Sequence, residues 1–194
     1  MSRPNNVSST TTEVLVSPIT PEQFADFMSL EYLASDDDLL NAFLLTACQM
    51  CIAYTNNELL ERTWVYRADR IPEVSKGYGG LGPVPAVLEP WISFPITPIQ
   101  SITGVTLDGD AYTDFTTDLN SRPARIELDD NGVIEITYLA GVATAVEIDS
   151  RLLLGINMLA MYLYDNRGCD MAQAVEASGA VAAWYSIKLL SGGL

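Results

Sequence analysis

The stretch from Ser35 to Thr55, SDDDLLNAFLLTACQMCIAYT, has the pattern of a long amphipathic helix. Ser35 is expected to cap it by accepting a hydrogen bond from a backbone N–H three residues on. The aspartates at 36–38 place negative charge at the positive end of the helix dipole. Apolar residues then recur at helical spacing, at Leu39, Leu40, Phe43, Leu44, Ala47, Met50, Cys51 and Tyr54. We expect this helix to be the spine of the fold.

A second long helix is expected over residues 151–166, capped by Asp149 or Ser150 and stopped by Gly168. A shorter helix is expected from Pro21, with Thr20 as its N-cap. The apolar stripes of the two long helices should pack against each other. The residues expected in that helix core are Leu40, Phe43, Leu44, Ala47, Cys51, Leu152, Ile156, Leu159 and Leu163.

Residues 61–141, between the long helices, contain short runs of alternating apolar and polar residues, which are typical of antiparallel strands. Asp108-Gly109 is a hairpin turn sequence. The run 129–132 is expected to join strands 125–128 and 133–138 as a second hairpin. Residues 71–90 are rich in glycine and proline, which predicts a long irregular loop.

The order of these elements predicts an α+β fold. We expect an antiparallel helical bundle, two long helices plus short ones, with a small antiparallel β-domain inserted between the long helices. Residues 1–17 are expected to form a mobile N-terminal arm and 179–194 an extended C-terminal segment. The expected bounds of the single domain are 18–178, with helices in 20–57 and 149–178 and the β-part at 61–141.

The composition is strongly acidic and moderately apolar. The 194 residues are 48% hydrophobic and carry a formal charge of −15. Residues 1–60 and 61–148 each carry −7, and residues 149–194 carry −1. Such a chain will not bind nucleic acid through phosphate contacts. No apolar run is long enough to predict a membrane span, and the N-terminus lacks the apolar core of a secretory signal, so we expect a protein that matures in a cytoplasm.

The residue types that carry catalysis or bind metals are sparse. The chain has no histidine, which removes the commonest general base and the histidine-containing zinc sites. Cys48 and Cys51 have CxxC spacing, but they fall on the apolar stripe in mid-helix, so we expect them to be packing residues. The aspartates at 36–38 lack the spacing of a calcium loop. No catalytic residue, metal site or cofactor is therefore predicted.

Two segments are candidates for contact with other proteins. The glycine-rich run 77–82 lacks the lysine of a phosphate loop and is expected to be a contact loop, with Lys76, Tyr78 and Leu81 as its working side chains. The C-terminal segment contains a group of aromatic and aliphatic residues that either pack onto the core or anchor a partner. These residues are Trp184, Tyr185, Ile187, Leu189 and Leu190.

The order of motifs from Pro18 to Leu190 resembles the head–tail connector proteins of tailed bacteriophages and gene transfer agents, also called head-to-tail adaptors or head-completion proteins. The motifs that carry the resemblance are Pro18-Ile19-Thr20, Asp36 to Leu40, Tyr54-Thr55, Thr63-Trp64, Phe94-Pro95, Pro98 to Ile102 with Val105, Ile134 to Tyr138 with Ala140-Gly141, and Tyr164 to Arg167. The spacing of these motifs is more specific than any one of them.

The resemblance implies a structural virion protein, with no enzyme activity, that forms a twelve-subunit ring below the portal. Such a ring extends the DNA channel and offers the tail its attachment surface. The implied partners are identical subunits, the portal protein and tail or tail-completion proteins, with passing double-stranded DNA not specifically bound and no membrane. By position, residues Trp184 to Leu190 would dock on the portal, and Lys76 to Leu81 would face the tail or the lumen.

Two other functions are open on the sequence alone. An acidic DNA mimic or regulatory binder would use its carboxylates against a basic protein. A carboxylate-dependent hydrolase would need two acids that converge in a pocket with one pKa raised, and the sequence marks no such pair. A large symmetric oligomer would favour the connector over both.

Overall fold

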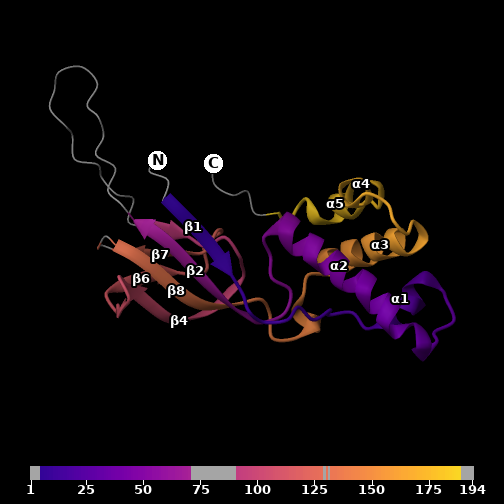
Figure 1. Ribbon diagram of the computed structural model, residues 1–194, viewed down its shortest axis with the longest axis horizontal. Helices are drawn as coiled ribbons and strands as arrows, with labels where there is room; N and C mark the ends of the chain where they lie inside the picture. Colours follow the sequence, from indigo (N-terminus) through magenta and orange to yellow (C-terminus); the bar gives the residue numbers. More distant parts are fainter. Residues whose placement is uncertain (1–4, 71–90, 129, 131, 189–194) are drawn as a thin grey trace, which may run out of the picture. The chain divides into compact units, whose positions relative to one another are not determined.

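The computed structural model describes residues 5–70, 91–128, 130 and 132–188. These residues form a mixed α and β structure with antiparallel sheets and five α-helices. The chain divides into two compact units (Figure 1). The β unit comprises Met1–Thr12 and Arg62–Ala140, and the helical unit comprises Glu13–Glu61 and Gly141–Leu194. The sequence predicted one domain with an inserted β-part at 61–141 and did not assign the N-terminal residues to that part.

The β unit contains two antiparallel sheets. Five strands pair in the order β1-β2-β8-β4-β5, and three pair in the order β3-β7-β6. In chain order the strands are β1 (Asn5–Thr10), β2 (Arg62–Arg70), β3 (Trp91–Ser93), β4 (Ile99–Leu107), β5 (Asp110–Ala111), β6 (Phe115–Asp118), β7 (Arg125–Leu128) and β8 (Gly132–Ala140).

The N-terminal residues, which we expected to be mobile, form strand β1 from Asn5 to Thr10. It pairs with β2 in antiparallel register, with Thr10 opposite Val65 and Ser8 opposite Arg67. The other edge of β2 is already paired with β8. The remaining edge of β2 thus supplies the hydrogen-bonding partner that a serine- and threonine-rich segment lacks on its own.

The expected hairpin between 125–128 and 133–138 is wrong, although both segments are strands. β8 is paired on one side with β2 and on the other with β4. It therefore has no free edge for β7, which pairs with β3 and β6 in the second sheet. Alternation of apolar and polar residues indicates a strand but does not specify its partner.

The turn at Asp108-Gly109 is confirmed between β4 and β5. Both residues have positive φ, 53° and 93°, which is the conformation of a two-residue type I′ turn. The Asp108 carboxylate also accepts a hydrogen bond from the backbone N–H of Val133 at 2.8 Å. The turn is therefore joined to the start of β8.

The core of the β unit lies between the inner faces of its sheets. Phe94 is buried against two tyrosines, with ring centroids 4.9 Å from Tyr138 and 6.3 Å from Tyr66. The buried members of this core are Tyr66, Ala68, Phe94, Ile99, Val105, Ala124, Ile126, Leu128, Ile134, Ile136, Tyr138 and Ala140.

The helical unit contains α1 (Pro21–Met28), α2 (Asp37–Thr55), α3 (Ser150–Asp165), α4 (Met171–Ala177) and α5 (Ala180–Trp184). Thr20 caps α1 through a reciprocal pair of hydrogen bonds with Gln23. Asp149 caps α3 by accepting from the Arg151 N–H. The expected cap at Ser35 is wrong, because a 3₁₀ turn over Ala34–Asp36 precedes α2 and the Ser35 hydroxyl bonds to Asp36 instead.

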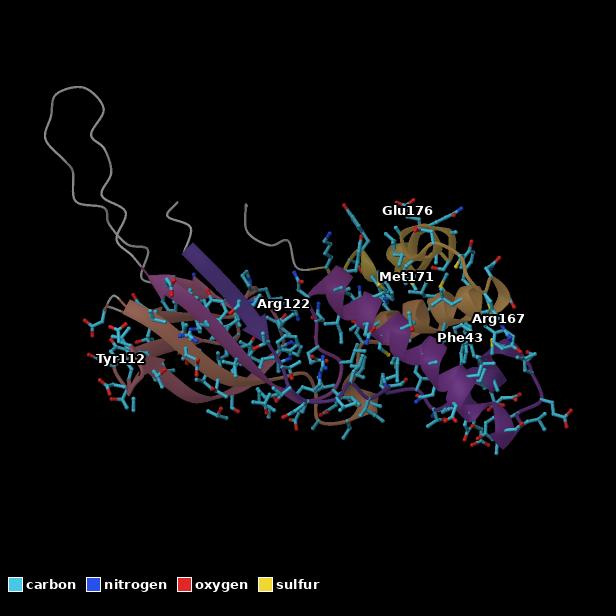
Figure 2. All side chains as sticks on the ribbon, in the orientation of Figure 1. Phe43, Tyr112, Arg122, Arg167, Met171 and Glu176 are labelled. Carbon is cyan, nitrogen blue, oxygen red and sulfur yellow. The ribbon has the colours of Figure 1, made fainter. Side chains whose placement is uncertain are left out.

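Helices α2 and α3 pack against each other and form the core of the helical unit. Of the helix-core residues predicted from the sequence, all are buried except Phe43, which is half-buried. Phe43 meets Tyr164 edge to face at 6.0 Å, and the Arg167 guanidinium lies over the same tyrosine ring at 5.2 Å. Figure 2 shows Phe43 and Arg167 close together near the C-terminal end of α3.

The chain leaves the helical unit at Glu61 and returns to it at Gly141. The two crossing segments are hydrogen-bonded to each other, from Glu61 N–H to the Val142 carbonyl and from Val142 N–H to the Leu59 carbonyl. Gly141 has φ +106°, and a Cβ there would collide with the backbone of Leu60. Only glycine fits this crossing without strain.

Candidate docking surfaces

The CxxC pair lies inside the helical unit. Cys48 and Cys51 are fully buried, and neither forms a disulfide. Burial raises the pKa of the Cys48 thiol to about 12, and burial likewise raises the pKa of Cys51. Thiols with raised pKa values are poor nucleophiles and poor metal ligands. No group of three or more metal-ligating side chains occurs in the described ranges of the chain. The pair therefore acts in packing.

Trp184, which we predicted as a docking residue, is fully buried in the helical unit. Its indole N–H donates to the Leu152 carbonyl of α3 at 3.2 Å. A Cβ at Gly155 would collide with the indole, so this glycine makes the space for it. The Tyr54 ring lies 6.0 Å from the same indole. Of the two readings left open by the sequence, the packing reading describes Trp184.

The residues after Trp184 are held along the ends of α2 and α3. The Ser186 hydroxyl accepts a hydrogen bond from Arg151 at 2.7 Å. The Lys188 ammonium lies over the Tyr54 ring at 4.6 Å. Tyr185 is 73% exposed and Ile187 is half-buried. In the described part of the C-terminal segment, Tyr185 is thus the most exposed large apolar side chain.

Arg151 holds this segment because a carboxylate orients it. Asp149 accepts two hydrogen bonds from the guanidinium, at 2.9 and 2.6 Å, and one from the Arg151 N–H. Chiefly through the side-chain hydrogen bond, Arg151 lowers the pKa of Asp149 to about 2. The remaining guanidinium nitrogen donates to Ser186. The α3 cap and the C-terminal segment therefore share one arginine.

The other residues predicted for docking lie outside the described residues. These are Leu189 and Leu190 at the C-terminus, and Lys76, Tyr78 and Leu81 in the loop of residues 71–90.

The structure reveals a surface that the sequence did not mark, at the turn from α1 to α2. Phe27, Leu30, Leu33 and Leu39 are each between 40% and 53% exposed. We call these four side chains the α1–α2 corner. The sequence pattern predicts Leu39 on the buried stripe of the spine helix, and the structure leaves it 40% exposed. Leu39 and Leu40 are adjacent in the sequence, so the apolar stripe is wider than the face that a helix buries. This width was the one sign in the sequence that part of the stripe would be exposed.

A smaller apolar face lies on α3. Leu154 is 47% exposed and Met161 is 39% exposed. Their spacing of seven residues places them on the same side of the helix. These residues match those of the α1–α2 corner in exposure, but residues 150–164 around them in the sequence include no acid.

The α1–α2 corner is surrounded in sequence by carboxylates. Glu22, Asp26, Glu31, Asp36 and Asp38 are all exposed. No lysine or arginine occurs between Arg3 and Arg62. The helical unit as a whole has fourteen acids and three bases, net −11, whereas the β unit has eleven acids and seven bases, net −4. Most of the negative charge of the protein therefore lies in the helical unit.

By length and hydropathy alone, residues Ala34–Thr55 would suffice to cross a membrane. Core helices pass the same test, and α2 contributes Leu44, Ala47 and Cys51 to the interior of the helical unit. The buried face of α2 is thus a face of the core.

Comparison with known proteins gives matches among solved structures. No protein-family model and no curated protein sequence matches the chain. One match is a chain in the neck of an empty gene transfer agent (GTA) particle, computed with C6 symmetry, which is 19% identical to this chain. The alignment covers 96% of this chain and 98% of that chain, with a TM-score of 0.68. A chain in the neck of a native GTA particle, with C12 symmetry, is 17% identical over 96% and 98%, with a TM-score of 0.67.

The virion of the native gene transfer agent particle contains a chain that is 17% identical over 95% of this chain and 98% of its own, with a TM-score of 0.68. The protein shares the fold of a gene transfer agent neck chain. The likeness spans the β unit and the helical unit together. It agrees with the resemblance to head–tail connectors that the sequence motifs indicated.

Proposed function

We propose that the protein is a structural component of a virion neck, a head-to-tail adaptor that forms a ring below the portal. The observation that carries the proposal is the match in fold over 96% of this chain and 98% of a neck chain. Because nearly all of each chain is covered, the two proteins share an arrangement of elements from end to end, beyond a common motif. This favours the adaptor over an acidic DNA mimic, a regulatory binder or a carboxylate-dependent hydrolase.

The ring is proposed to contain twelve identical subunits and to extend the DNA channel. C12 symmetry in one of the matched necks supports this number. The acidity supports the channel, because carboxylates repel phosphate and let DNA pass without being held. The helical unit, at net −11, carries most of this repulsion.

The remaining partners in this proposal are the portal protein and the tail or tail-completion proteins. Docking on the portal is assigned to the C-terminal residues Tyr185, Ile187, Leu189 and Leu190, with Trp184 holding the segment in place from inside the core. The loop residues Lys76, Tyr78 and Leu81 are assigned to the tail side or the lumen. The protein would act at the head–tail junction after synthesis in the host cytoplasm.

The decisive experiment removes the gene from a strain that produces the particles. We expect heads without tails, seen by electron microscopy, and recovery of tailed particles when the purified protein is added back. Imaging of the protein with purified portal rings should show a stacked ring of twelve subunits. Normal tailed particles in the absence of the protein would contradict the adaptor function.

The docking assignment needs a smaller change than removal of the whole C-terminal segment. Deletion of residues 180–194 would remove Trp184 from the core and would confuse misfolding with lost docking. Deletion of residues 189–194, combined with Tyr185→Ala, keeps every described contact of Trp184. We expect this variant to fold with wild-type ellipticity and to lose binding to portal rings. Wild-type binding by the variant would end the assignment.

A further inference from the structure

We propose that the α1–α2 corner is a docking surface for a cationic amphipathic polypeptide segment, one with apolar anchors flanked by lysine or arginine. The surface consists of Phe27, Leu30, Leu33 and Leu39 among exposed carboxylates. The proposed function assigns no role to it.

The corner presents its apolar side chains on an ordered turn. α1 ends in a left-handed residue, Ser29, and the Leu30 N–H returns to the Ala25 carbonyl at 3.0 Å. The Tyr32 hydroxyl donates to the Asp37 carboxylate at 2.6 Å and ties the turn to the first residue of α2. Because the turn is held by these bonds, little conformational entropy remains to be lost when a partner binds.

The apolar side chains are not needed for the interior. Phe24 and Ala25 are the buried residues of α1, and Leu40 is the first buried residue of α2. Phe27, Leu30, Leu33 and Leu39 lie beside them and remain 40–53% exposed. Large apolar side chains held at a surface and rimmed by charge are characteristic of interaction sites.

Charge selects the class of partner. Glu22, Asp26, Glu31, Asp36 and Asp38 surround the corner along the chain, and no basic residue lies between Arg3 and Arg62. Phosphate groups of nucleic acids and anionic lipid headgroups would be repelled. A segment with lysine or arginine beside its apolar anchors would satisfy both features at once and would be steered to the site.

The same corner of a second copy is a poorer occupant than such a segment. Within the described part of the helical unit, the basic residues are already engaged: Arg151 with Asp149 and Ser186, Arg167 over Tyr164, and Lys188 over Tyr54. The unit has a net charge of −11, so the corners of two copies would repel each other.

The test uses the full chain and a fluorescein-labelled peptide of leucine and lysine, ordered as an amphipathic helix. Binding is followed by fluorescence anisotropy between about 0.05 and about 0.5 M sodium chloride. A peptide of the same composition in scrambled order reports on charge alone. We expect the ordered peptide to bind at least about tenfold more tightly than the scrambled one, because only it can present its apolar anchors together.

Two double variants with matched exposure locate the site. Leu33→Ser with Leu39→Ser should weaken binding of the ordered peptide about tenfold or more. Leu154→Ser with Met161→Ser, on α3, should leave binding unchanged. Glu31→Gln with Asp38→Asn should reduce the salt dependence of binding. Circular dichroism of each variant establishes that it is folded.

Three results would overturn the proposal. Equal binding of the ordered and scrambled peptides would reduce the interaction to net charge. Equal loss in the corner and α3 variants would place the site elsewhere. Self-association in sedimentation velocity that disappears in the corner variant would make a second copy the occupant. None of these results bears on tail attachment, which is measured separately in particles.

Discussion

The β unit and the helical unit achieve their order in different ways. In the β unit, pairing between distant segments decides the structure, from β1 at the N-terminus to β8 at the end of the insertion. In the helical unit, local caps at Thr20 and Asp149 start the helices, and a single tryptophan then closes the core. Local sequence signals therefore describe helices better than they describe a sheet.

The units differ also in charge and in what they offer to partners. The helical unit holds net −11 against −4 for the β unit. It also carries the exposed apolar side chains of the α1–α2 corner and Tyr185. Four predictions sharpen or break this comparison, from the largest expected effect to the smallest.

Trp184→Ala should destabilise the helical unit by about 3–5 kcal/mol, because it leaves a cavity above Gly155 and removes the hydrogen bond to Leu152. Thermal unfolding by ellipticity at the helix band measures the loss. The fluorescence of this variant comes from Trp64 and Trp91, both in the β unit, and reports on that unit alone.

The neighbouring variant Tyr185→Ala is the control for this change, since Tyr185 is exposed, and it should change stability by less than about 0.5 kcal/mol. Phe94→Ala is the counterpart in the β unit and should cost about 3–5 kcal/mol there. If Trp184→Ala lowered the ellipticity and fluorescence midpoints equally, the units would unfold together, and the contrast between them would fail.

Gly141→Ala should cost about 2–4 kcal/mol, because φ is +106° and the new Cβ would collide with the Leu60 backbone at the crossing into the helical unit. Chemical denaturation measures it. Gly168→Ala is the matched control, with φ +85° and open space around the new Cβ, and should cost only about 1 kcal/mol. Equal costs would show that the close approach at Gly141 is unimportant.

Thr20→Ala should cost about 1 kcal/mol, because it removes the hydroxyl that accepts from the Gln23 N–H at the start of α1. Ser35→Ala should cost less than about 0.5 kcal/mol, since Ser35 bonds to Asp36 rather than to a backbone N–H. The free energy of unfolding of both variants, measured at equilibrium, distinguishes the helix cap at Thr20 from the cap that the sequence predicted at Ser35. A larger cost at Ser35 than at Thr20 would restore the cap inferred from the sequence.

Apart from the control variants, Asp149→Asn should have the smallest effect, below about 1 kcal/mol at neutral pH, because the Asp149–Arg151 pair is partly exposed and screened. In the folded wild-type protein, the pKa of the Asp149 carboxyl is lowered from 3.8 to about 2. The stabilisation from the carboxylate is therefore present above the unfolded pKa and is lost as pH falls through the folded value. Unfolding measured from pH about 5 to about 2 should show the two proteins converge. A constant difference would exclude the carboxylate as its source.

Several features were determined by the sequence alone. The approximate positions of α2 and α3, the cap at Thr20 and the Asp108-Gly109 turn depend on contacts between residues close in sequence, and the cap of α3 was narrowed to Asp149 or Ser150. The motifs also indicated the head–tail connector fold that the solved neck structures share.

Other features were decided only by the tertiary structure. β7 lies in a different sheet from β8 because both edges of β8 are taken by strands distant in sequence. The N-terminal segment is a strand because β2 offers it an edge. Trp184 is buried because Gly155, twenty-nine residues earlier, leaves room for its indole. The side chains of the α1–α2 corner are exposed because the core covers other residues of α1 and α2, and the local sequence does not show which residues the core will cover.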